Sequence, residues 1–345
     1  MIRAGCTCGG IDVHAHVVPE HFPRCLSVPE PSDWPSTVAA EPCHRHVMVS
    51  GKVYRTVSDR CWSAPKRLAD MDAMGLAVQA LSPMPELLSY WMAPGPGGEL
   101  LRFINDTIAE MAARADGRFV GLGGVPLQDV EAAIAEMERC LRDLGFAGVE
   151  IGSNVNGRPI GAPDFAPFFA AAEAMGAAVF VHALRPAGMD RLVGPGQLQQ
   201  VIAYPTDVGL AAASVITSNL IVRHPRLRLA FSHGGGTLGL LLPRLEEGRR
   251  VFPAVERAVS ESPTAQARRL FYDALVYDEP TLRHLVSLFG EGQVMLGTDY
   301  PFNFHERRPV ARAEAAFADP ALRARLIRAN AAAFLGRPAL ASEAA

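Results

Sequence analysis

The chain has 345 residues, of which 49% are hydrophobic and 20% are charged, and its formal net charge is −3. This length suits one large α/β domain or two ordinary domains. The near balance of charge argues against nucleic acid as a partner, because surfaces that bind nucleic acid carry a clear basic excess. No apolar run reaches membrane-spanning length and the N-terminus lacks the apolar core of a signal peptide, so we expect a cytoplasmic protein with no membrane partner.

The six cysteines stand at positions 6, 8, 25, 43, 61 and 140. A chain of this length in a reducing compartment does not need a disulfide framework. Cys6 and Cys8 are close enough in sequence to share a metal, but no second cysteine pair accompanies them at zinc-finger spacing. Free thiols are therefore the favoured interpretation.

The first predicted strand is the apolar run Ile11-Asp-Val-His-Ala-His16. Side chains alternate along a strand, so His14 and His16 point the same way about 7 Å apart. Two imidazoles at one strand end suit a divalent transition metal. A His-x-His pair on its own is weak evidence, because it also occurs by chance.

Residues 17–60 are rich in Pro, Ser, Cys and His and show no sustained helical period. The segment is too long for an ordinary loop. It predicts a small insertion after the first strand, with short strands near residues 46–50 and 52–54. Insertions at the C-terminal end of a barrel strand commonly shape a substrate pocket.

From residue 63 onward, helical and strand-like segments alternate. We predict helices at 63–75, 98–115, 128–143, 164–175, 207–223 and from 237, and strands near residues 11, 78, 119, 147, 177, 227, 270 and 294. Eight strands that alternate with helices predict an α/β fold of the (β/α)8 TIM-barrel class, as a single domain over 1–345 with the insertion inside it. A doubly wound open sheet is the alternative, but no Gly-rich nucleotide turn follows the first strand.

Polar side chains stand at the ends of four predicted strands. His14 and His16 end the first strand, and the fifth, sixth and eighth end in His182, His233 and Asp299. In a barrel these ends meet at one face around the axis, where such enzymes keep their chemistry. One histidine that closes a strand is usually a packing residue, but four with an aspartate predict a metal site.

Four motifs extend this pattern into a resemblance to a known family. The chain resembles the decarboxylase branch of the amidohydrolase superfamily, typified by 2-amino-3-carboxymuconate-6-semialdehyde decarboxylase and containing γ-resorcylate, 5-carboxyvanillate and dihydroxypicolinate decarboxylases. The motifs are Ile11-Asp-Val-His-Ala-His16, Val125-Pro-Leu-Gln-Asp129, Ser232-His-Gly-Gly-Gly236 and Met295-Leu-Gly-Thr-Asp-Tyr-Pro-Phe302. The resemblance implies a metal-dependent carboxy-lyase that releases CO₂ from a hydroxylated or amino-substituted aromatic or muconate-type acid.

The resemblance also implies roles for the strand-end residues. One Zn²⁺, with Mn²⁺ as an alternative, is held by His14, His16, His182 and Asp299. His233 beside the metal is the implied acid/base, and Asp299 shares in proton transfer. Three imidazoles and a carboxylate leave a position open for water or substrate, as a catalytic site requires.

A second metal is not expected. Two-metal amidohydrolases usually carry a carboxylated lysine at the end of strand four, and this chain has no lysine near that place. Glu150 lies in strand four and either bridges a second metal or points at the surrounding helices. We predict one metal.

Three residues are implied to bind the substrate: Arg55, Arg244 and Phe302. The two arginines resemble a carboxylate-binding pair, and in the family the second one reaches into the neighbouring subunit's site, which implies a homodimer. The alternatives are a solvated loop arginine for Arg55 and a surface salt bridge for Arg244. Phe302, with Tyr90 and Trp91, either walls a flat conjugated substrate or packs at the rim.

One stretch departs from the branch. The semialdehyde decarboxylase has a tryptophan near the metal after the strand-five histidine, whereas residues 183–192 contain no aromatic residue. This puts the semialdehyde in doubt as the substrate. Arg185 and Arg191 there either contact an anion or lie on the surface.

Two other functions fit the same metal site. One is a metal-dependent hydrolase of a C–N or lactone bond in a small acidic substrate, and the other is a metal-binding protein without catalysis. The branch-specific motifs and the missing strand-four lysine favour decarboxylation over hydrolysis. The complete acid/base set argues against a protein without catalysis.

Overall fold

The computed structural model describes residues 9–26 and 31–341. At its centre is a sheet of eight parallel strands in the order β1-β5-β6-β7-β10-β11-β12-β13. The strands are β1 (Gly10–Val17), β5 (Leu76–Pro83), β6 (Phe119–Gly124), β7 (Gly148–Gly152), β10 (Ala178–His182), β11 (Arg228–Phe231), β12 (Phe271–Asp273) and β13 (Val294–Met295). Each predicted strand is present near its predicted place.

Backbone hydrogen bonds join the last strand of the sheet to the first. The Val13 N–H donates to the Leu296 carbonyl (3.0 Å), and the His16 N–H donates to the Tyr300 carbonyl (2.7 Å). Ala15 and Tyr300 also form a parallel bridge. The sheet therefore closes on itself as the predicted (β/α)8 TIM barrel rather than as an open doubly wound sheet.

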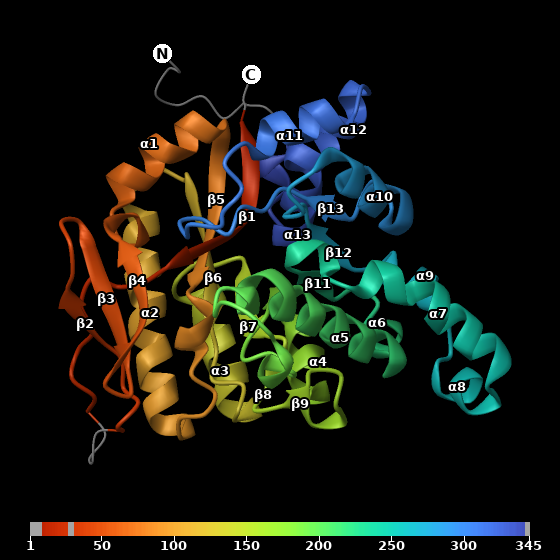
Figure 1. Ribbon diagram of the computed structural model, residues 1–345, viewed down its shortest axis with the longest axis horizontal. Helices are drawn as coiled ribbons and strands as arrows, with labels where there is room; N and C mark the ends of the chain where they lie inside the picture. The colour runs from red at the N-terminus through yellow and green to blue at the C-terminus, as the bar shows by residue number, and fades with distance from the viewer. Residues whose placement is uncertain (1–8, 27–30, 342–345) are drawn as a thin grey trace.

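Helices surround the barrel strands (Figure 1). They are α1 (Ala64–Met74), α2 (Pro94–Ala113), α3 (Val130–Arg142), α4 (Ala166–Met175), α5 (Tyr204–Thr217), α6 (Leu220–Arg223), α7 (Leu238–Val251), α8 (Pro253–Ala258), α9 (Pro263–Ala267), α10 (Glu279–Phe289), α11 (Pro309–Ala316), α12 (Pro320–Ala324) and α13 (Asn330–Leu335). The helix predicted over 207–223 is divided in two, because Asn219 adopts a left-handed conformation (φ 57°). No described helix is long and apolar enough to cross a membrane.

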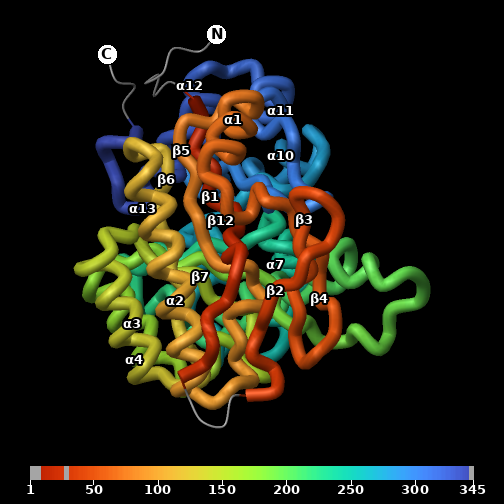
Figure 2. The backbone as a smooth tube through the Cα atoms, turned by 90° about the vertical axis from the view of Figure 1, so that its left-hand side faces the viewer, coloured from red at the N-terminus to blue at the C-terminus, as the bar shows by residue number. Residues whose placement is uncertain are grey.

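The insertion after β1 forms a small antiparallel sheet of β2 (Ser36–Ala39), β3 (His44–Val49) and β4 (Lys52–Ser58). It lies at one edge of the molecule in Figure 1 and toward the viewer in Figure 2. Val47 and Val57 are buried and pack in a common cluster with Val18, at the end of the first barrel strand. This packing holds β4 beside the C-terminal end of the barrel, as expected for an insertion that shapes a pocket.

Four cysteines lie within the described residues. Cys25, Cys43, Cys61 and Cys140 are free thiols, as predicted. The pair at positions 6 and 8 lies outside the described residues.

Candidate active site

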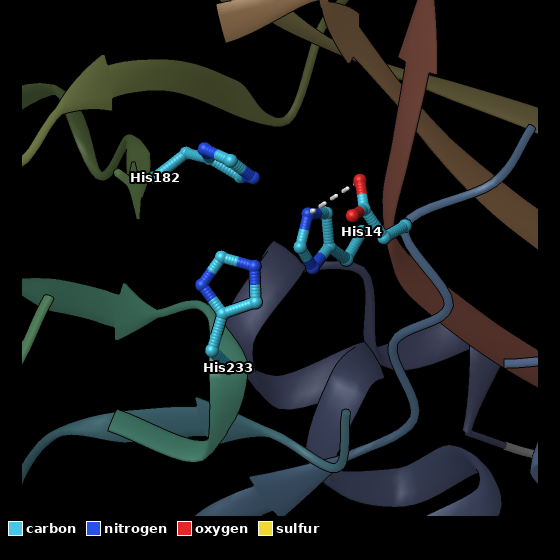
Figure 3. Close-up of side chains that lie close together, drawn as sticks. His14, His182 and His233 are labelled. Atoms are coloured by element: carbon cyan, nitrogen blue, oxygen red, sulfur yellow. Dashed lines mark ion pairs between the residues drawn. The ribbon is translucent and has the colours of Figure 1, made fainter. Parts of the chain in front are cut away.

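Side chains from four strand ends converge at the C-terminal face of the barrel. His14 comes from β1 and His182 from β10, while His233 and Asp299 follow β11 and β13. One ligand atom from each of these residues lies within 4.8 Å of the others. Figure 3 shows the three imidazoles pointing toward one another from separate elements. The structure therefore brings together side chains that are up to 285 positions apart.

His16 belongs to the same cluster. Its Nε2 atom lies 3.1 Å from Nε2 of His14 and 3.1 Å from Oδ1 of Asp299. Nε2 of His14 lies 3.5 Å from the same carboxylate oxygen. Spacings of this size are those between ligand atoms that share one metal ion with bonds of about 2.0–2.1 Å.

Backbone carbonyls set the tautomers of two of these histidines. Nδ1 of His16 lies 3.0 Å from the Pro83 carbonyl oxygen, and Nδ1 of His182 lies 2.9 Å from that of Ala183. A carbonyl only accepts, so in each ring Nδ1 carries the hydrogen and Nε2 presents a lone pair.

A buried carboxylate sets the tautomer of His14. Nδ1 of His14 donates to Oδ2 of Asp273 (2.6 Å), and the other carboxylate oxygen accepts the N–H groups of Gly234 and Leu275. Burial raises the pKa of Asp273, while its hydrogen bonds act in the opposite direction. A carboxylate behind a ligating histidine fixes the orientation of the ring and raises its basicity.

The resulting lone pairs face one another without a hydrogen between them. Nε2 of both His14 and His16 is an acceptor, so their 3.1 Å separation is repulsive unless a cation lies between them. Nε2 of His182 and Oδ1 of Asp299 are also buried and lack a hydrogen-bond partner among the described residues. These orphaned acceptors fit a divalent metal ion.

Burial keeps the imidazoles neutral. It lowers the pKa of His14, His16 and His233 to about 3 and that of His182 well below its usual range. A neutral imidazole is the form that binds a metal. The site is therefore ready to accept a cation at neutral pH without first losing protons.

Two of the site residues lie on strained backbone. His233 has φ 54° and Asp299 has φ 61°, a region that residues other than glycine rarely adopt. The turn after His233 also requires Gly236, because a Cβ there would meet the Pro205 carbonyl oxygen at 1.8 Å. Strain of this kind persists where surrounding contacts impose it, and it is concentrated at functional sites.

A cavity of about 290 Å³ opens onto the cluster, and His182, His233 and Asp299 form part of its wall. Phe302, another wall residue, stacks on the ring of His16, with centroids 5.4 Å apart and planes at 24°. The Arg55 guanidinium lies over the same Phe302 ring, 4.3 Å from its centroid. One cavity therefore brings together an aromatic surface, a cation and the candidate metal site.

The two predicted arginines occupy different positions. Arg55 is half-buried in the cavity wall, and no described residue forms an ion pair with it. Arg244 is exposed on α7 and is not among the described residues that line this cavity. The structure thus brings Arg55, but not Arg244, to the site of its own chain.

A sequence model of the amidohydrolase family matches residues 11–337. The chain belongs to the amidohydrolase family. It is 35% identical to the 2-amino-3-carboxymuconate-6-semialdehyde decarboxylase of Dictyostelium discoideum over 87% of this chain and 83% of that protein. It is 27% identical to the γ-resorcylate decarboxylase of Rhizobium radiobacter over 68% of this chain and 76% of that protein. The predicted resemblance to the decarboxylase branch is confirmed.

Solved structures agree with the fold of this amidohydrolase-family chain. The apo form of IDCase from Metarhizium anisopliae superposes with a TM-score of 0.81 at 18% identity, covering 96% of this chain and 97% of that one. A dihydroxybenzoic acid decarboxylase from Polaromonas sp. JS666, with bound manganese and the inhibitor 2-nitroresorcinol, gives a TM-score of 0.73 at 19% identity, covering 95% and 97%. At these identities the likeness supports the barrel.

The structure also shows in which direction the Glu150 side chain of this amidohydrolase points. Its Oε2 atom lies 3.7 Å from Nδ1 of His16, so the side chain faces the barrel interior rather than the helices. Both carboxylate oxygens are buried without a hydrogen-bond partner among the described residues, and burial raises the pKa of Glu150 well above its usual range. The expectation of a single metal stays a prediction.

Sequence reasoning missed two residues beside the site. Asp273 ends β12 just as the predicted ligands end their strands, so the same signal was available for it. Tyr204 lies at the N-terminus of α5, and its ring centroid is 6.1 Å from that of His182 and 6.4 Å from that of His233. Residues 183–192 lack an aromatic residue, but Tyr204 places one beside the cluster. It directly follows a π-helical turn over Gln199–Ala203.

Other predicted rim residues have packing roles. Tyr90 is buried, and its hydroxyl accepts the Gly152 N–H. The Arg185 guanidinium lies 3.1 Å from the Trp91 ring centroid and forms an ion pair with Glu86 (2.9 Å). Arg191 is exposed. Of the three aromatic residues considered, only Phe302 lines the cavity.

Proposed function

We propose that the protein is a metal-dependent non-oxidative decarboxylase that releases CO₂ from a hydroxylated or amino-substituted aromatic or muconate-type carboxylic acid. One observation carries the proposal: acceptors of the strand-end cluster that lack a hydrogen-bond partner, and Arg55, which lacks an ion-pair partner, both within the described part of the chain, line the same cavity. This places a cation-binding centre and a carboxylate-binding group within reach of one small, flat acid. The decarboxylase relatives supply the reaction type.

We propose that His14, His16, His182 and Asp299 hold one divalent ion, Zn²⁺ or, as in the Polaromonas relative, Mn²⁺. The fixed tautomers of the three histidines support this ligand set over one that includes His233. The Nδ1 atom of His233 lies 3.1 Å from the Ser232 hydroxyl, a partner that both donates and accepts and so does not set the tautomer. A bound ion supplies a Lewis acid that polarises an oxygen of the substrate.

The chain's own residues then perform the proton transfer. Arg55 holds the substrate carboxylate, and Phe302 supports the face of the conjugated system. His233, whose ring is neutral, relays a proton from water to the carbon that bears the carboxylate, with Asp299 sharing in the transfer. The bond from this carbon to the carboxylate breaks, CO₂ leaves, and the electron pair of that bond restores the conjugated system. The product carries the new C–H bond, so the proton is consumed.

We also propose that the working unit is a homodimer in which Arg244 serves the partner's site. Leu240 on α7 is 77% exposed and stands one helical turn before Arg244, and Leu210 on α5 is 52% exposed. The segment between β10 and α5 projects from the body in Figure 2, and Val193 in it is 92% exposed. Exposed apolar side chains around an arginine fit a protein interface. The cytoplasmic location and the absence of a nucleic-acid partner stay predictions.

The test is to load purified protein with Zn²⁺ or Mn²⁺ and to offer hydroxybenzoates, hydroxypicolinates and carboxymuconate semialdehydes while measuring CO₂. We expect CO₂ from at least one acid, reduced by roughly 10²- to 10⁴-fold in His233→Ala, because general acid–base catalysis typically contributes that much. The variant should retain its metal content, since His233 is not a proposed ligand. Turnover of amides or lactones without CO₂ release from any acid would instead establish a hydrolase.

A further inference from the structure

Arg67 on α1 is a fully buried arginine outside the cavity wall. Its guanidinium makes no ion pair with a carboxylate of the described residues; instead, one nitrogen donates to the backbone carbonyl of His16 (2.7 Å). The same nitrogen donates to the Arg60 carbonyl (3.1 Å). Removing a guanidinium from water is costly, so this placement requires compensating contacts.

A second contact of Arg67 reaches the other ligand of β1 through two buried side chains. Nη1 of Arg67 donates to Oε1 of Gln79 on β5 (2.9 Å), and Nε2 of Gln79 donates to Oδ2 of Asp12 (2.8 Å). Oδ1 of Asp12 accepts the backbone N–H of His14 (3.0 Å). Arg67 therefore holds β1 on both sides of the His-x-His pair.

The same relay reaches the segment that carries Asp299. Asp12 accepts the Thr298 N–H (3.0 Å) and the Thr298 hydroxyl (2.6 Å). On the other side of Asp299, the Arg67 guanidinium lies 4.8 Å from the ring centroid of Tyr300. The residues before and after this candidate ligand are thus both tied to Arg67.

These side-chain bonds stand where the backbone ladder is irregular. The register between β1 and β5 shifts between Asp12 and Ala15, around His14. The strand therefore lacks regular pairing at the point where its two imidazoles must be placed to within a fraction of an ångström. The relay through Gln79 and Asp12 supplies buried hydrogen bonds there instead.

We propose that Arg67 is a positioning residue for the metal centre, which acts through Gln79 and Asp12 to set the geometry of His14, His16 and Asp299. It touches neither the metal nor the substrate. The inference rests on the proposed ligand set but not on the reaction, because metal affinity is measured without turnover. A failure to find CO₂ release would leave it standing.

The test compares Arg67→Met and Gln79→Met with wild type, starting from chelated protein. We expect Mn²⁺ affinity, measured by chelator competition, to fall by roughly 10- to 100-fold in each variant, as for other partners behind metal ligands. The visible absorption of bound Co²⁺ should change, because ligand geometry changes. Arg67→Lys keeps the charge but loses the planar fork, so its Mn²⁺ affinity should lie between that of Arg67→Met and that of wild type.

Arg328→Met is the matched control. Arg328 is also a buried arginine (7% exposed), and it donates to the Gly9 carbonyl, at the end of β1 opposite from the site. This variant should lose thermal stability but keep the metal affinity and the Co²⁺ spectrum. A folded Arg67→Met or Gln79→Met that binds Mn²⁺ as tightly as wild type, with an unchanged Co²⁺ spectrum, would overturn the proposal. If Arg67→Met does not fold, Gln79→Met and Arg67→Lys decide it.

Discussion

Asp273 acts on the candidate metal site through a histidine, since its carboxylate bonds to Nδ1 of His14 at 2.6 Å. We expect Asp273→Asn to weaken metal binding by roughly 10- to 100-fold, because a neutral amide no longer raises the basicity of the ring or imposes its tautomer. Chelator competition with Zn²⁺ measures this. Asp278→Asn is the control: it makes the same change at the N-cap of α10, where asparagine also accepts the Thr281 N–H, and should leave the affinity unchanged. Equal affinities in both variants would contradict the prediction.

Which residues gather at the site was largely predictable, because each candidate ligand follows an apolar run. Glu150 was not, because a barrel strand is buried on both faces and alternation cannot choose between them. Asp273 carries the signal of the ligands, but its place behind His14 depends on how far apart two strand ends lie. Tyr204 follows a π-helical turn. The extra residue of such a turn leaves no mark in the hydrophobic pattern, so the position of the Tyr204 ring could not be predicted.

At the scale of elements, the loop from α6 to β11 is anchored to α4 by Glu173. This carboxylate accepts the Arg226 N–H (2.8 Å) and lies 3.4 Å from Nδ1 of His224, and its pKa is lowered chiefly by the backbone hydrogen bond. A lowered folded pKa contributes stability above the unfolded value of about 4.3, and this is lost as the pH falls through the folded pKa. Glu173→Gln should therefore cost about 1 kcal/mol of unfolding free energy at pH 7 and a smaller amount at pH 3, which lies below the unfolded pKa.

Urea unfolding of the chelated protein at the two pH values measures this difference, free of any effect of metal release. Glu110→Gln is the control, because the Glu110 side chain on α2 is 71% exposed and its carboxylate lies 3.8 Å from the guanidinium of Arg114, which is 76% exposed. Such a surface pair contributes little, so the control should stay within about 0.5 kcal/mol of wild type at both pH values. A Glu173→Gln cost that is undiminished at pH 3 would mean that the side chain stabilises by packing rather than by charge.

The elements themselves were predicted well wherever a long hydrophobic period existed. The helix over 207–223 was predicted as one because its apolar pattern continues past Asn219. The left-handed backbone of Asn219 is a local property that the hydrophobic pattern does not reveal. The insertion was recognised by its length and composition, and short strands were predicted within it near residues 46–50 and 52–54, where β3 and β4 lie. The pairing of β2 with β3 and β4, and hence the delivery of Arg55 to the cavity, depends on register.

At the scale of the whole molecule, the proposed homodimer predicts which subunit each functional residue serves. Suppose that every site uses its own His233 and the partner's Arg244. A mixed dimer of His233→Ala and Arg244→Ala subunits then has one site with both residues intact and one with neither. We expect the two variants, each inactive alone, to regain decarboxylation when subunits are exchanged by mild unfolding and refolding together.

The size of the regained activity is set by statistics: random exchange makes half of the dimers mixed, each with one of its two sites intact, so about a quarter of wild-type activity returns. Mixing His233→Ala with His14→Ala is the control, because both residues belong to the same site and every mixed dimer lacks one in each site. If mixed dimers form, as followed by differential tags, and no activity returns, Arg244 serves its own chain. The exposed position of Arg244, away from the cavity of its own subunit, is the reason to expect the other outcome.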